Sequence, residues 1–376
     1  MRLADLRTPA LVLDRAVLTA NIAAMSARAK SFGIDLKPHM KTSKCAEIAR
    51  LATDGHSGGL CVSTVEEVRY FAREGFRDIT YAVGIAPGKL ADLGPALDAG
   101  ARVTLLLDDP ATARAVAARA GALDLRFPVL IEIDSGMHRA GLPPESPEIL
   151  EIGRVLADAS HLTPAGVLTH GGQSYGARGP EDCRAAAEDE RRAIVAAAET
   201  LVGAGIPCPR IAPGATPNAV HMASAEGLTE IRPGNYVFYD LHMVSIGACR
   251  PEQIAISVLA TVIGHNRARN QMVIDAGALA LSLDASAQHR LPEAGYGWLC
   301  DAASRGRLGD LRLGRLSQEH GVVTSDRPLP FDDLPIGARV RVLPSHSCMT
   351  AAAYPAYHLV EGGETVVDRW ERTNGW

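Results

Sequence analysis

The chain lacks the long apolar runs that mark secreted and membrane-spanning proteins. No apolar core of signal-peptide length follows Met1, and no later apolar run reaches the roughly 18 residues of a membrane span. We therefore expect a soluble, cytoplasmic protein that has no membrane partner.

An excess of basic charge and a regular cysteine pattern are also missing. The 38 Lys and Arg residues are outnumbered by 43 Asp and Glu residues, which gives a net charge of −5. No basic stripe or patch is present, which argues against a nucleic-acid partner. The seven cysteines have no paired spacing, and their odd number indicates free thiols in a reducing compartment.

What the chain does have is a regular alternation of short apolar runs and helical segments. Its 376 residues are 47% hydrophobic, enough for one large barrel and a smaller domain. Short apolar runs with β-branched residues recur eight times, separated by Ala-, Arg- and Glu-rich segments. The runs lie at 36–39, 60–62, 79–83, 103–107, 129–133, 166–170, 210–212 and 231–237. This order predicts a (β/α)8 TIM barrel over residues 1–250, with its site at the C-terminal strand ends.

Residues 251–376 have a different texture. Strand-like runs follow one another there, broken by Gly, Pro and Asn, and predict an all-β C-terminal domain. The opening run at 10–14 is also strand-like and fits pairing with either this domain or the barrel.

Polar groups gather where the predicted barrel strands end, from side chains and from the main chain of glycines, in greater number than a purely structural barrel needs. They are His39 and Lys41; Asp134, His138 and Arg139; His170, Gln173 and Tyr175; Gly214 and Thr216; and Gly234, Asn235 and Tyr236.

The first of these strand ends reads Pro38-His39-Met40-Lys41-Thr42-Ser43-Lys44. A lysine that attacks an aldehyde carbonyl needs a rigid position and a neighbouring cation that favours the neutral amine. Pro38 provides rigidity and Lys44 provides a second cation. The segment therefore predicts a lysine that binds a cofactor, although a solvated turn has the same composition.

Two Gly- and Pro-containing turns, 213–218 and 232–236, follow the seventh and eighth runs. Barrels commonly bind phosphate at this place, through main-chain N–H groups that glycine lets approach closely. Two ordinary turns are the alternative interpretation.

A possible metal site lies in the β domain at His346-Ser347-Cys348. Residues two apart on an extended chain project to the same side, so His346 and Cys348 can bind one ion. Nitrogen and thiolate ligands suit zinc or another borderline divalent metal. An isolated His-x-Cys motif is more often coincidental.

In combination, these motifs resemble fold-type III pyridoxal-phosphate enzymes of the D-threonine aldolase and D-serine dehydratase group, whose barrel is alanine racemase-like. The resemblance covers nearly the whole chain. It is carried by four segments in that family's order: 8–14, the Pro-His-x-Lys-Thr-x-Lys motif at 38–44, 132–141 with its Gly-Met-His-Arg-x-Gly sequence, and His346-Ser347-Cys348.

The resemblance implies a set of site residues. Lys41 would bind pyridoxal 5'-phosphate covalently and act with His39 in catalysis, while Lys44 would be solvated. The further implied cofactor contacts are Arg139 beside the ring oxygen, His170 and Tyr175 at the ring, and Gly214, Thr216, Gly234, Asn235 and Tyr236 at the phosphate. His346 and Cys348 would hold a divalent metal, Mn or Zn, with Mg or Co as alternatives. Gln173 and His320 are weaker candidates for substrate contact. Ser43 stands where relatives often have histidine, which leaves that histidine's role without a counterpart.

Two reactions on a D-β-hydroxy-α-amino acid fit this set. We expect retro-aldol cleavage to glycine and an aldehyde, as in D-threonine aldolase. This expectation rests on the overall resemblance of the chain, including the loop at 171–176. The alternative is elimination by a D-serine or 3-hydroxyaspartate dehydratase. Both use the same lysine, metal and cofactor.

Two further interpretations are an amino-acid racemase, with Tyr354 as its second base, and a non-catalytic pyridoxal-phosphate carrier. The β domain and the His346–Cys348 pair argue against the carrier. The resemblance also implies a head-to-tail homodimer.

Overall fold

The computed structural model describes all residues 1–376 and divides into two compact units. We call Ala24–Gly234 with Thr373–Trp376 the α/β unit, and Met1–Ala23 with Asn235–Arg372 the β unit. The boundary near the N-terminus falls within helix α1 (Arg15–Ser31).

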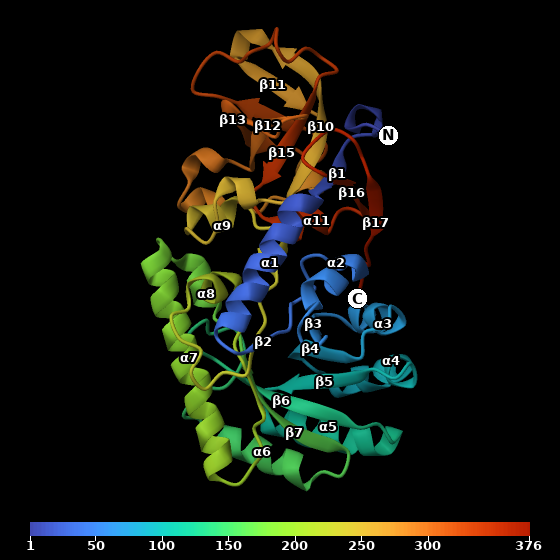
Figure 1. Ribbon diagram of the computed structural model, residues 1–376, viewed down its shortest axis with the longest axis vertical. Helices are drawn as coiled ribbons and strands as arrows, with labels where there is room; N and C mark the ends of the chain where they lie inside the picture. Colours follow the sequence, from blue (N-terminus) through green and yellow to red (C-terminus); the bar gives the residue numbers. More distant parts are fainter. The chain divides into compact units, whose positions relative to one another are not determined.

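A six-stranded parallel sheet forms the centre of the α/β unit, with its strands in chain order (Figure 1). The strands are β3 (Leu60–Val62), β4 (Asp78–Gly84), β5 (Arg102–Leu107), β6 (Phe127–Ile133), β7 (Leu162–Thr169) and β8 (Arg210–Ala212). The helices of this unit after α1 are α2 (Ala46–Thr53), α3 (Val65–Arg73), α4 (Gly94–Asp98), α5 (Pro110–Leu123), α6 (Glu148–Asp158), α7 (Pro180–Gly203) and α8 (Thr216–His221). Helices connect the successive strands, as parallel pairing requires.

Side-chain caps explain why two of these helices begin where they do. The Thr64 side chain accepts a hydrogen bond from Glu67 N at the start of α3. Asp109 caps α5 in the same way, and Pro110 occupies the first helical position, where no N–H donor is needed.

A separate parallel pair, β2 (Asp35–Leu36) and β9 (Glu230–Ile231), accounts for the first and last of the eight predicted strands. Main-chain hydrogen bonds run from Met40 N to Cys61 O (2.8 Å) and from Arg232 N to Pro213 O (3.1 Å), one toward each edge of the six-stranded sheet. The prediction of a parallel α/β architecture is confirmed, and its regular sheet has six strands rather than eight.

The predicted strand at 231–237 is wrong beyond Ile231. Residues Asn235–Val237 form a short 3-10 helix, η4. Pro233 has no N–H to donate to a ladder and Gly234 has no side chain to pack, so the strand ends before them.

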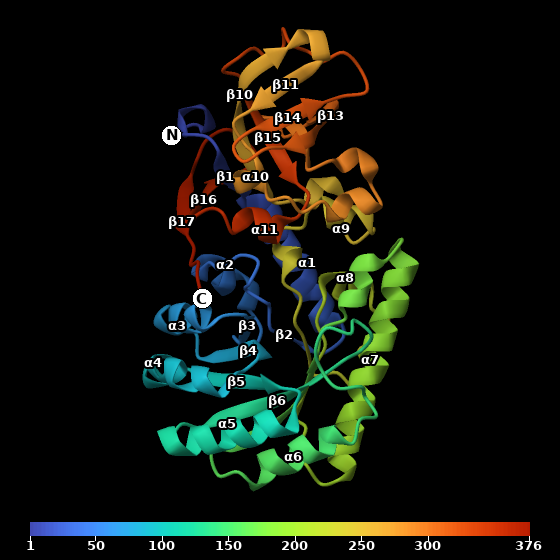
Figure 2. The same ribbon diagram turned by 180° about the vertical axis from the view of Figure 1, so that it is seen from behind.

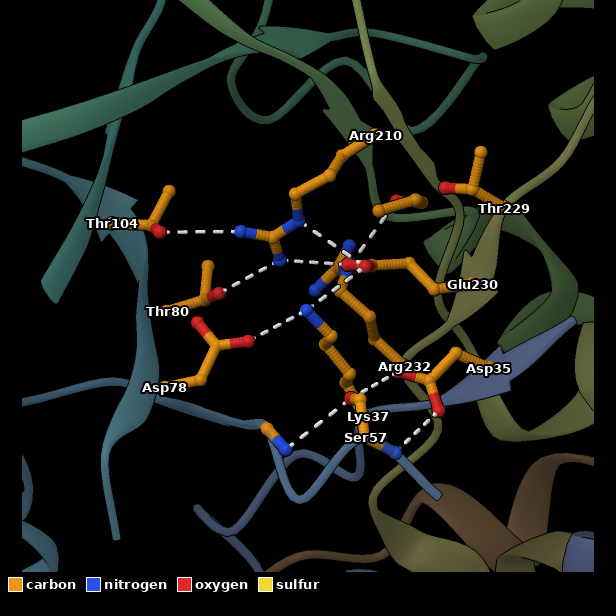
Figure 3. A network of polar contacts seen from close by, with 12 residues as sticks. Asp35, Lys37, Ser57, Asp78, Thr80, Thr104, Arg210, Thr229, Glu230 and Arg232 are labelled. Atoms are coloured by element: carbon orange, nitrogen blue, oxygen red, sulfur yellow. Dashed lines mark hydrogen bonds and ion pairs between the residues drawn. The ribbon is translucent and has the colours of Figure 1, made fainter. Parts of the chain in front are cut away.

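The interior of the α/β unit contains an ion-paired network near the N-terminal ends of its strands (Figure 3). Lys37 Nζ lies 2.8 Å from Asp78 Oδ2 and 3.3 Å from Glu230 Oε2. Arg210 pairs with Glu230 at 2.7 Å and donates to the Thr80 and Thr104 hydroxyls. The predicted site residues follow the opposite, C-terminal ends.

The β unit is built on a nine-stranded sheet in the order β11-β14-β13-β12-β15-β10-β1-β16-β17 (Figure 2). Strand β11 also pairs with β10, which closes six antiparallel strands into a ring. The opening strand β1 pairs antiparallel with β10 and parallel with β16. The strands are β1 (Ala10–Asp14), β10 (Ile256–Asn266), β11 (Gln271–Ile274), β12 (Gly297–Asp301), β13 (Arg307–Leu316), β14 (Gly321–Thr324), β15 (Arg339–Pro344), β16 (Ala356–Val360) and β17 (Asp368–Glu371).

The β unit has three short α-helices besides the first part of α1: α9 (Leu241–Ser245), α10 (Ala278–Leu281) and α11 (Ser347–Ala351). Across the whole chain, no helix combines the length and the apolar character that spanning a membrane requires.

Candidate functional site

The structure brings four of the predicted residues together in one cavity of the α/β unit. Lys41, His39, Arg139 and His170 line a cavity of about 200 Å³. They come from the segments that follow β2, β6 and β7. The C-terminal strand ends therefore converge as predicted.

Burial keeps the two histidines of this cavity neutral. It lowers the pKa of His39 well below its ordinary value, and Lys41, Arg232 and His170 lower it further. Burial, followed by the charge of Lys41, lowers the pKa of His170 to about 3. Because His170 Nδ1 contacts the Gly214 carbonyl, which only accepts, Nδ1 carries the proton and Nε2 is an acceptor. The Tyr175 ring centroid lies 6.0 Å from that of His170.

Arg232 belongs to the same cavity and was missed by the sequence analysis. Its buried guanidinium donates to the carbonyls of Ala212 and Thr169. In the sequence it precedes Pro233 and Gly234, which indicate a turn. Its position as the second residue of the eighth run, directly after Ile231, was the signal that could have found it.

Glu132 is the one acidic residue lining the cavity. Its pKa is raised, by burial first and then by the neighbouring charge of Asp108. The cavity is therefore dominated by the positive side chains of Lys41, Arg139 and Arg232, and suits an anionic group.

The two turns predicted to bind phosphate, 213–218 and 232–236, make different contacts within the protein. Gly214 N donates to Glu190 Oε1 at 3.0 Å, and buried Thr216 begins α8. A Cβ at Gly234 would lie 2.6 Å from the His39 carbonyl oxygen, so only glycine allows this turn to approach the lysine segment.

The other two predicted phosphate residues, Asn235 and Tyr236, belong to the β unit. Asn235 Nδ2 donates to Asp240 Oδ2 (2.8 Å) and to Ser347 Oγ (2.9 Å). Tyr236 is fully buried, which raises its pKa.

His346 and Cys348 lie together in the β unit, but not on an extended chain. His346 is the N-cap of α11, and Cys348 lies in that helix's first turn. His346 Nδ1 lies 2.6 Å from Asp284 Oδ2, which directs Nε2 away as a possible metal ligand. No third His, Cys, Asp or Glu completes a ligand group, so water or substrate would have to supply the remaining positions.

The electrostatics of this pair fit a cationic ligand. Burial acts to lower the pKa of His346, but its hydrogen bonds with Asp284 and Cys348 and the charge of Asp240 raise it to about 11. The hydrogen bond from His346, more than any other contact, lowers the pKa of Asp284. A metal would replace the shared proton between nitrogen and sulfur.

Asp240 holds this segment in place. Its carboxylate accepts from Ser347 N at 2.9 Å and caps α9 through Met243 N at 2.9 Å. The Asp240 carboxylate, the Asn235 amide and the Ser347 hydroxyl thus form one hydrogen-bonded group beside His346 and Cys348.

The remaining residues considered in the sequence analysis, outside the lysine cavity and the His346–Cys348 pair, have different surroundings. Gln173 donates to the Ser135 carbonyl at 2.9 Å in the α/β unit, whereas His320 lies exposed in the turn between β13 and β14. Tyr354 is buried and donates to the Ala280 carbonyl, which suits a core residue better than a racemase base. Lys44 is not solvated as expected, because it pairs with buried Glu67 at 3.1 Å.

Comparison with known proteins adds independent findings. The model of the alanine racemase N-terminal domain matches residues 13–242, and that of a putative serine dehydratase domain matches residues 255–360. The chain is 40% identical to D-threo-3-hydroxyaspartate dehydratase of Delftia sp. (strain HT23), covering 100% of this chain and 99% of that protein.

Two other relatives extend the range of activities. D-serine dehydratase of Dictyostelium discoideum is 30% identical over 99% of this chain and 98% of its own length. D-threonine aldolase of Arthrobacter sp. is 28% identical over 98% of this chain and 93% of its own length.

Among solved structures, a cysteine-to-alanine mutant of D-threo-3-hydroxyaspartate dehydratase, described as metal-free, matches with a TM-score of 0.96 and 39% identity over 100% of both chains. D-threonine aldolase from Filomicrobium marinum matches with a TM-score of 0.84 and 26% identity, over 99% of this chain and 96% of that one.

Proposed function

The chain belongs to the fold-type III pyridoxal-phosphate family of D-threonine aldolases and D-serine dehydratases, and from this we propose that it is a metal-dependent dehydratase of D-3-hydroxy amino acids. The proposed substrate class is a D-3-hydroxyaspartate, with D-serine as a smaller relative. The observation that carries this choice is the end-to-end identity of 40% with a 3-hydroxyaspartate dehydratase.

The residues of the α/β unit fit pyridoxal phosphate. Lys41, Arg139 and Arg232 supply three positive charges around the 200 Å³ cavity, and the cofactor is an anion with a phosphate and a phenolate oxygen. Lys41 would bind it covalently. The turns at Thr216 and Gly234 would hold the phosphate, and for Asn235 and Tyr236 this role stays a prediction. When bound, the cofactor supplies an acceptor for electrons released at the substrate α-carbon.

Lys41 is the group in this cavity that we assign to proton transfer. Its Nζ would take the proton from the substrate α-carbon. His39 and His170, whose pKa values burial lowers, are neutral at pH 7 and would orient groups by hydrogen bonding instead. Arg139, on the exposed loop after β6, would contact the cofactor or the substrate carboxylate.

The His346–Cys348 pair fits a divalent metal of the zinc or manganese kind. His346 Nε2 and Cys348 Sγ would be the protein ligands, with Asp284 fixing the imidazole. A metal held here would supply Lewis acidity toward a substrate hydroxyl.

Retro-aldol cleavage is the second candidate, favoured by the end-to-end similarity to D-threonine aldolase. It needs a base for the β-hydroxyl proton rather than for the α-proton. Ser43, buried in the lysine segment, carries a hydroxyl that is not a base at neutral pH. Elimination needs no base besides Lys41, to which we assign the α-proton, whereas cleavage would need a base other than Ser43.

Product analysis tests the choice. The enzyme loaded with cofactor and metal is incubated separately with D-threo-3-hydroxyaspartate, D-serine and D-threonine. Elimination gives a 2-oxo acid and ammonia in equal amounts: oxaloacetate, pyruvate and 2-oxobutanoate, respectively. The Lys41→Ala protein and the L-enantiomers are the controls. Glycine with glyoxylate from 3-hydroxyaspartate, or with acetaldehyde from D-threonine, and no ammonia, would instead establish the aldolase.

A further inference from the structure

The β unit contains a cavity of about 530 Å³. Its lining includes no residue of the lysine cavity and neither His346 nor Cys348. This volume lies within the range of small-molecule binding sites. Its lining includes Asp14, Trp298, Cys300, Arg305, Arg307 and Leu343. Residues from the opening strand β1, from β12 and from β15 thus surround one space.

The register of β12 and β15 places a further arginine on the same side. Trp298 is opposite Leu343, and Cys300 is opposite Arg341, in this antiparallel pair. Directly opposed residues project to one face, and residues two apart along a strand share it. Arg341 therefore lies on the same face of the sheet as Trp298, Cys300 and Leu343, although it does not itself line the cavity.

Arg341 is a buried cation without an ion-pair partner. It is 1% exposed, its Nη2 donates to the Gly363 carbonyl at 3.2 Å, and its Nε has no hydrogen-bond partner. Burial, with the neighbouring charge of Arg305, lowers its pKa to about 10. A buried guanidinium is costly unless an anion pairs with it.

The acids near Arg341 are already engaged or exposed. Asp14 pairs with Arg305 Nη1 at 2.8 Å and accepts from Ala16 N and Val17 N at the start of α1. The Asp301 carboxylate accepts from Ser304 N at 2.7 Å in its own loop, and Glu252 lies exposed at the rim.

Arg307 adds a cation at the mouth of the cavity. Its guanidinium carbon lies 3.7 Å from the centroid of the Trp298 ring, and it forms no ion pair. The exposed side chain is held over a buried ring with its charge unmatched. Arg305, Arg307 and Arg341 thus provide three guanidinium groups against one buried carboxylate, Asp14.

We propose that this cavity binds a small organic anion through a carboxylate or phosphate group, with Arg307 and the Arg305–Arg341 side of the cavity as its charge partners. Trp298 and Leu343 provide apolar contact for the rest of the ligand. Guanidinium groups match both anion types in geometry. The proposal is independent of the proposed reaction, because none of these residues belongs to the lysine cavity or the His346–Cys348 pair.

Titration calorimetry of the full-length holoenzyme tests this site. The probes are succinate and inorganic phosphate at constant ionic strength, with neutral succinamide as the uncharged control. We expect one saturable site per chain that depends on Arg307. The probe with the lower dissociation constant, succinate or phosphate, shows whether the site prefers a carboxylate or a phosphate group. Arg307→Ala should weaken binding about tenfold or more through loss of a charge-assisted contact. Arg126→Ala removes an exposed arginine of the α/β unit and should leave the affinity for the probe unchanged.

A second variant tests the buried cation. Arg341→Met removes the charge while keeping similar length, and should abolish binding if its circular dichroism spectrum is native. If that variant does not fold, the exposed Arg307 decides the question alone. The proposal is overturned if neither anion binds saturably by about 10 mM, an already weak affinity. It is equally overturned if Arg307→Ala and Arg126→Ala bind alike, as they would if the probe occupied the lysine cavity.

Discussion

Two lysines three positions apart in one segment have different surroundings. Lys41 lines the cavity with His39 and His170, whereas Lys44 pairs with buried Glu67. We expect Lys41→Ala to lose the visible absorbance of the lysine-bound cofactor and at least about a thousandfold in turnover. Lys44→Ala should keep the absorbance but lose about 2 kcal/mol of unfolding free energy, because Glu67 is left without its cation. A coloured, active Lys41→Ala protein would move the assignment to Lys44.

Glu190 on α7 is a positioning residue that sequence analysis missed. Its buried carboxylate accepts from Gly171 N at 2.6 Å, Gly214 N at 3.0 Å and Asn218 Nδ2 at 2.6 Å. Burial raises its pKa against these three hydrogen bonds. One side chain thereby fixes the loops that follow β7 and β8, including the carbonyl that orients His170.

Glu190→Gln should loosen those loops, because glutamine has one acceptor oxygen. If that oxygen accepts from Gly171 N and Gly214 N, the NH₂ group faces the Asn218 Nδ2 donor instead of accepting from it. We expect about a tenfold weaker affinity for pyridoxal phosphate, equivalent to one lost hydrogen bond to a charged group. Fluorescence titration of the apoenzyme measures this, with Glu188→Gln as the matched control on the same helix. A Glu190→Gln protein with native cofactor affinity and KM would contradict the positioning role.

The low pKa of His170 predicts a pH dependence of stability. Its folded-state pKa of about 3 lies below the ordinary value of 6.5, so the unfolded chain takes up the proton first as pH falls. The contribution is complete above pH 6.5 and is lost as pH drops toward 3, by up to about 1.4 kcal/mol per pH unit. Urea unfolding of the apoenzyme between pH 7 and 5 should therefore show a shallower slope for His170→Asn. The exposed His289→Asn should match the wild type, and an unchanged slope in both variants would refute the assignment.

At the scale of elements, the strands of the α/β unit are stabilised by charges as well as by apolar packing (Figure 3). Glu230 on β9 compensates both Lys37 and Arg210. The hydrogen bond and charge of Lys37 lower the pKa of Asp78 despite its burial. The pair β2–β9 is therefore joined to β4 and β8 by these contacts.

We expect Glu230→Gln to cost about 3–5 kcal/mol of unfolding free energy, since it leaves Arg210 without an ion pair and Lys37 with Asp78 alone. Chemical denaturation of the apoenzyme measures the loss. The surface pair Arg114–Glu151 is the comparison, because both side chains are at least half exposed. Arg114→Gln should change stability by no more than about 0.5 kcal/mol. Equal effects in the two variants would show that the network does not stabilise the fold.

Local patterns predicted the elements well and their partners poorly. Seven of the eight predicted runs coincide with strands within a few residues, because alternating apolar runs and capping residues act over short stretches. The eighth fails where Pro233 and Gly234 interrupt it. The side chains of His346 and Cys348 lie together although the backbone begins a helix there and is not an extended chain. Their role as metal ligands stays a prediction.

The missed residues depend on contacts distant in the sequence. Glu190 is one acid among several on a 24-residue helix, and only the fold reveals that three donors from other segments meet it. Arg232 and Asp284 are likewise identified by their neighbours in space rather than by a local motif. Sequence patterns identify candidate catalytic and cofactor-binding residues at strand ends, but not the side chains whose hydrogen bonds fix the position of the loops there.

At the scale of the whole molecule, the units do not follow the order of the chain. The predicted barrel of residues 1–250 includes β1, which pairs with β10 and β16 in the β unit. Such a pairing between residues over 200 positions apart leaves no local signal. The head-to-tail homodimer implied by the resemblance stays a prediction.

The two candidate ligand sites lie in different units, the lysine cavity in the α/β unit and the His346–Cys348 pair in the β unit. Their contributions should therefore separate experimentally. We expect Cys348→Ala, or thorough chelation of the wild type, to lower turnover by about a hundredfold or more.

The visible cofactor absorbance should persist in both preparations, because Lys41 is untouched. Added zinc or manganese should restore the chelated wild type but not the variant. Cys208→Ala, which removes a partly buried thiol of the α/β unit, should behave as wild type. Metal analysis of each preparation links the lost turnover to the lost ion, and full turnover in a metal-free preparation would exclude the ion from the reaction.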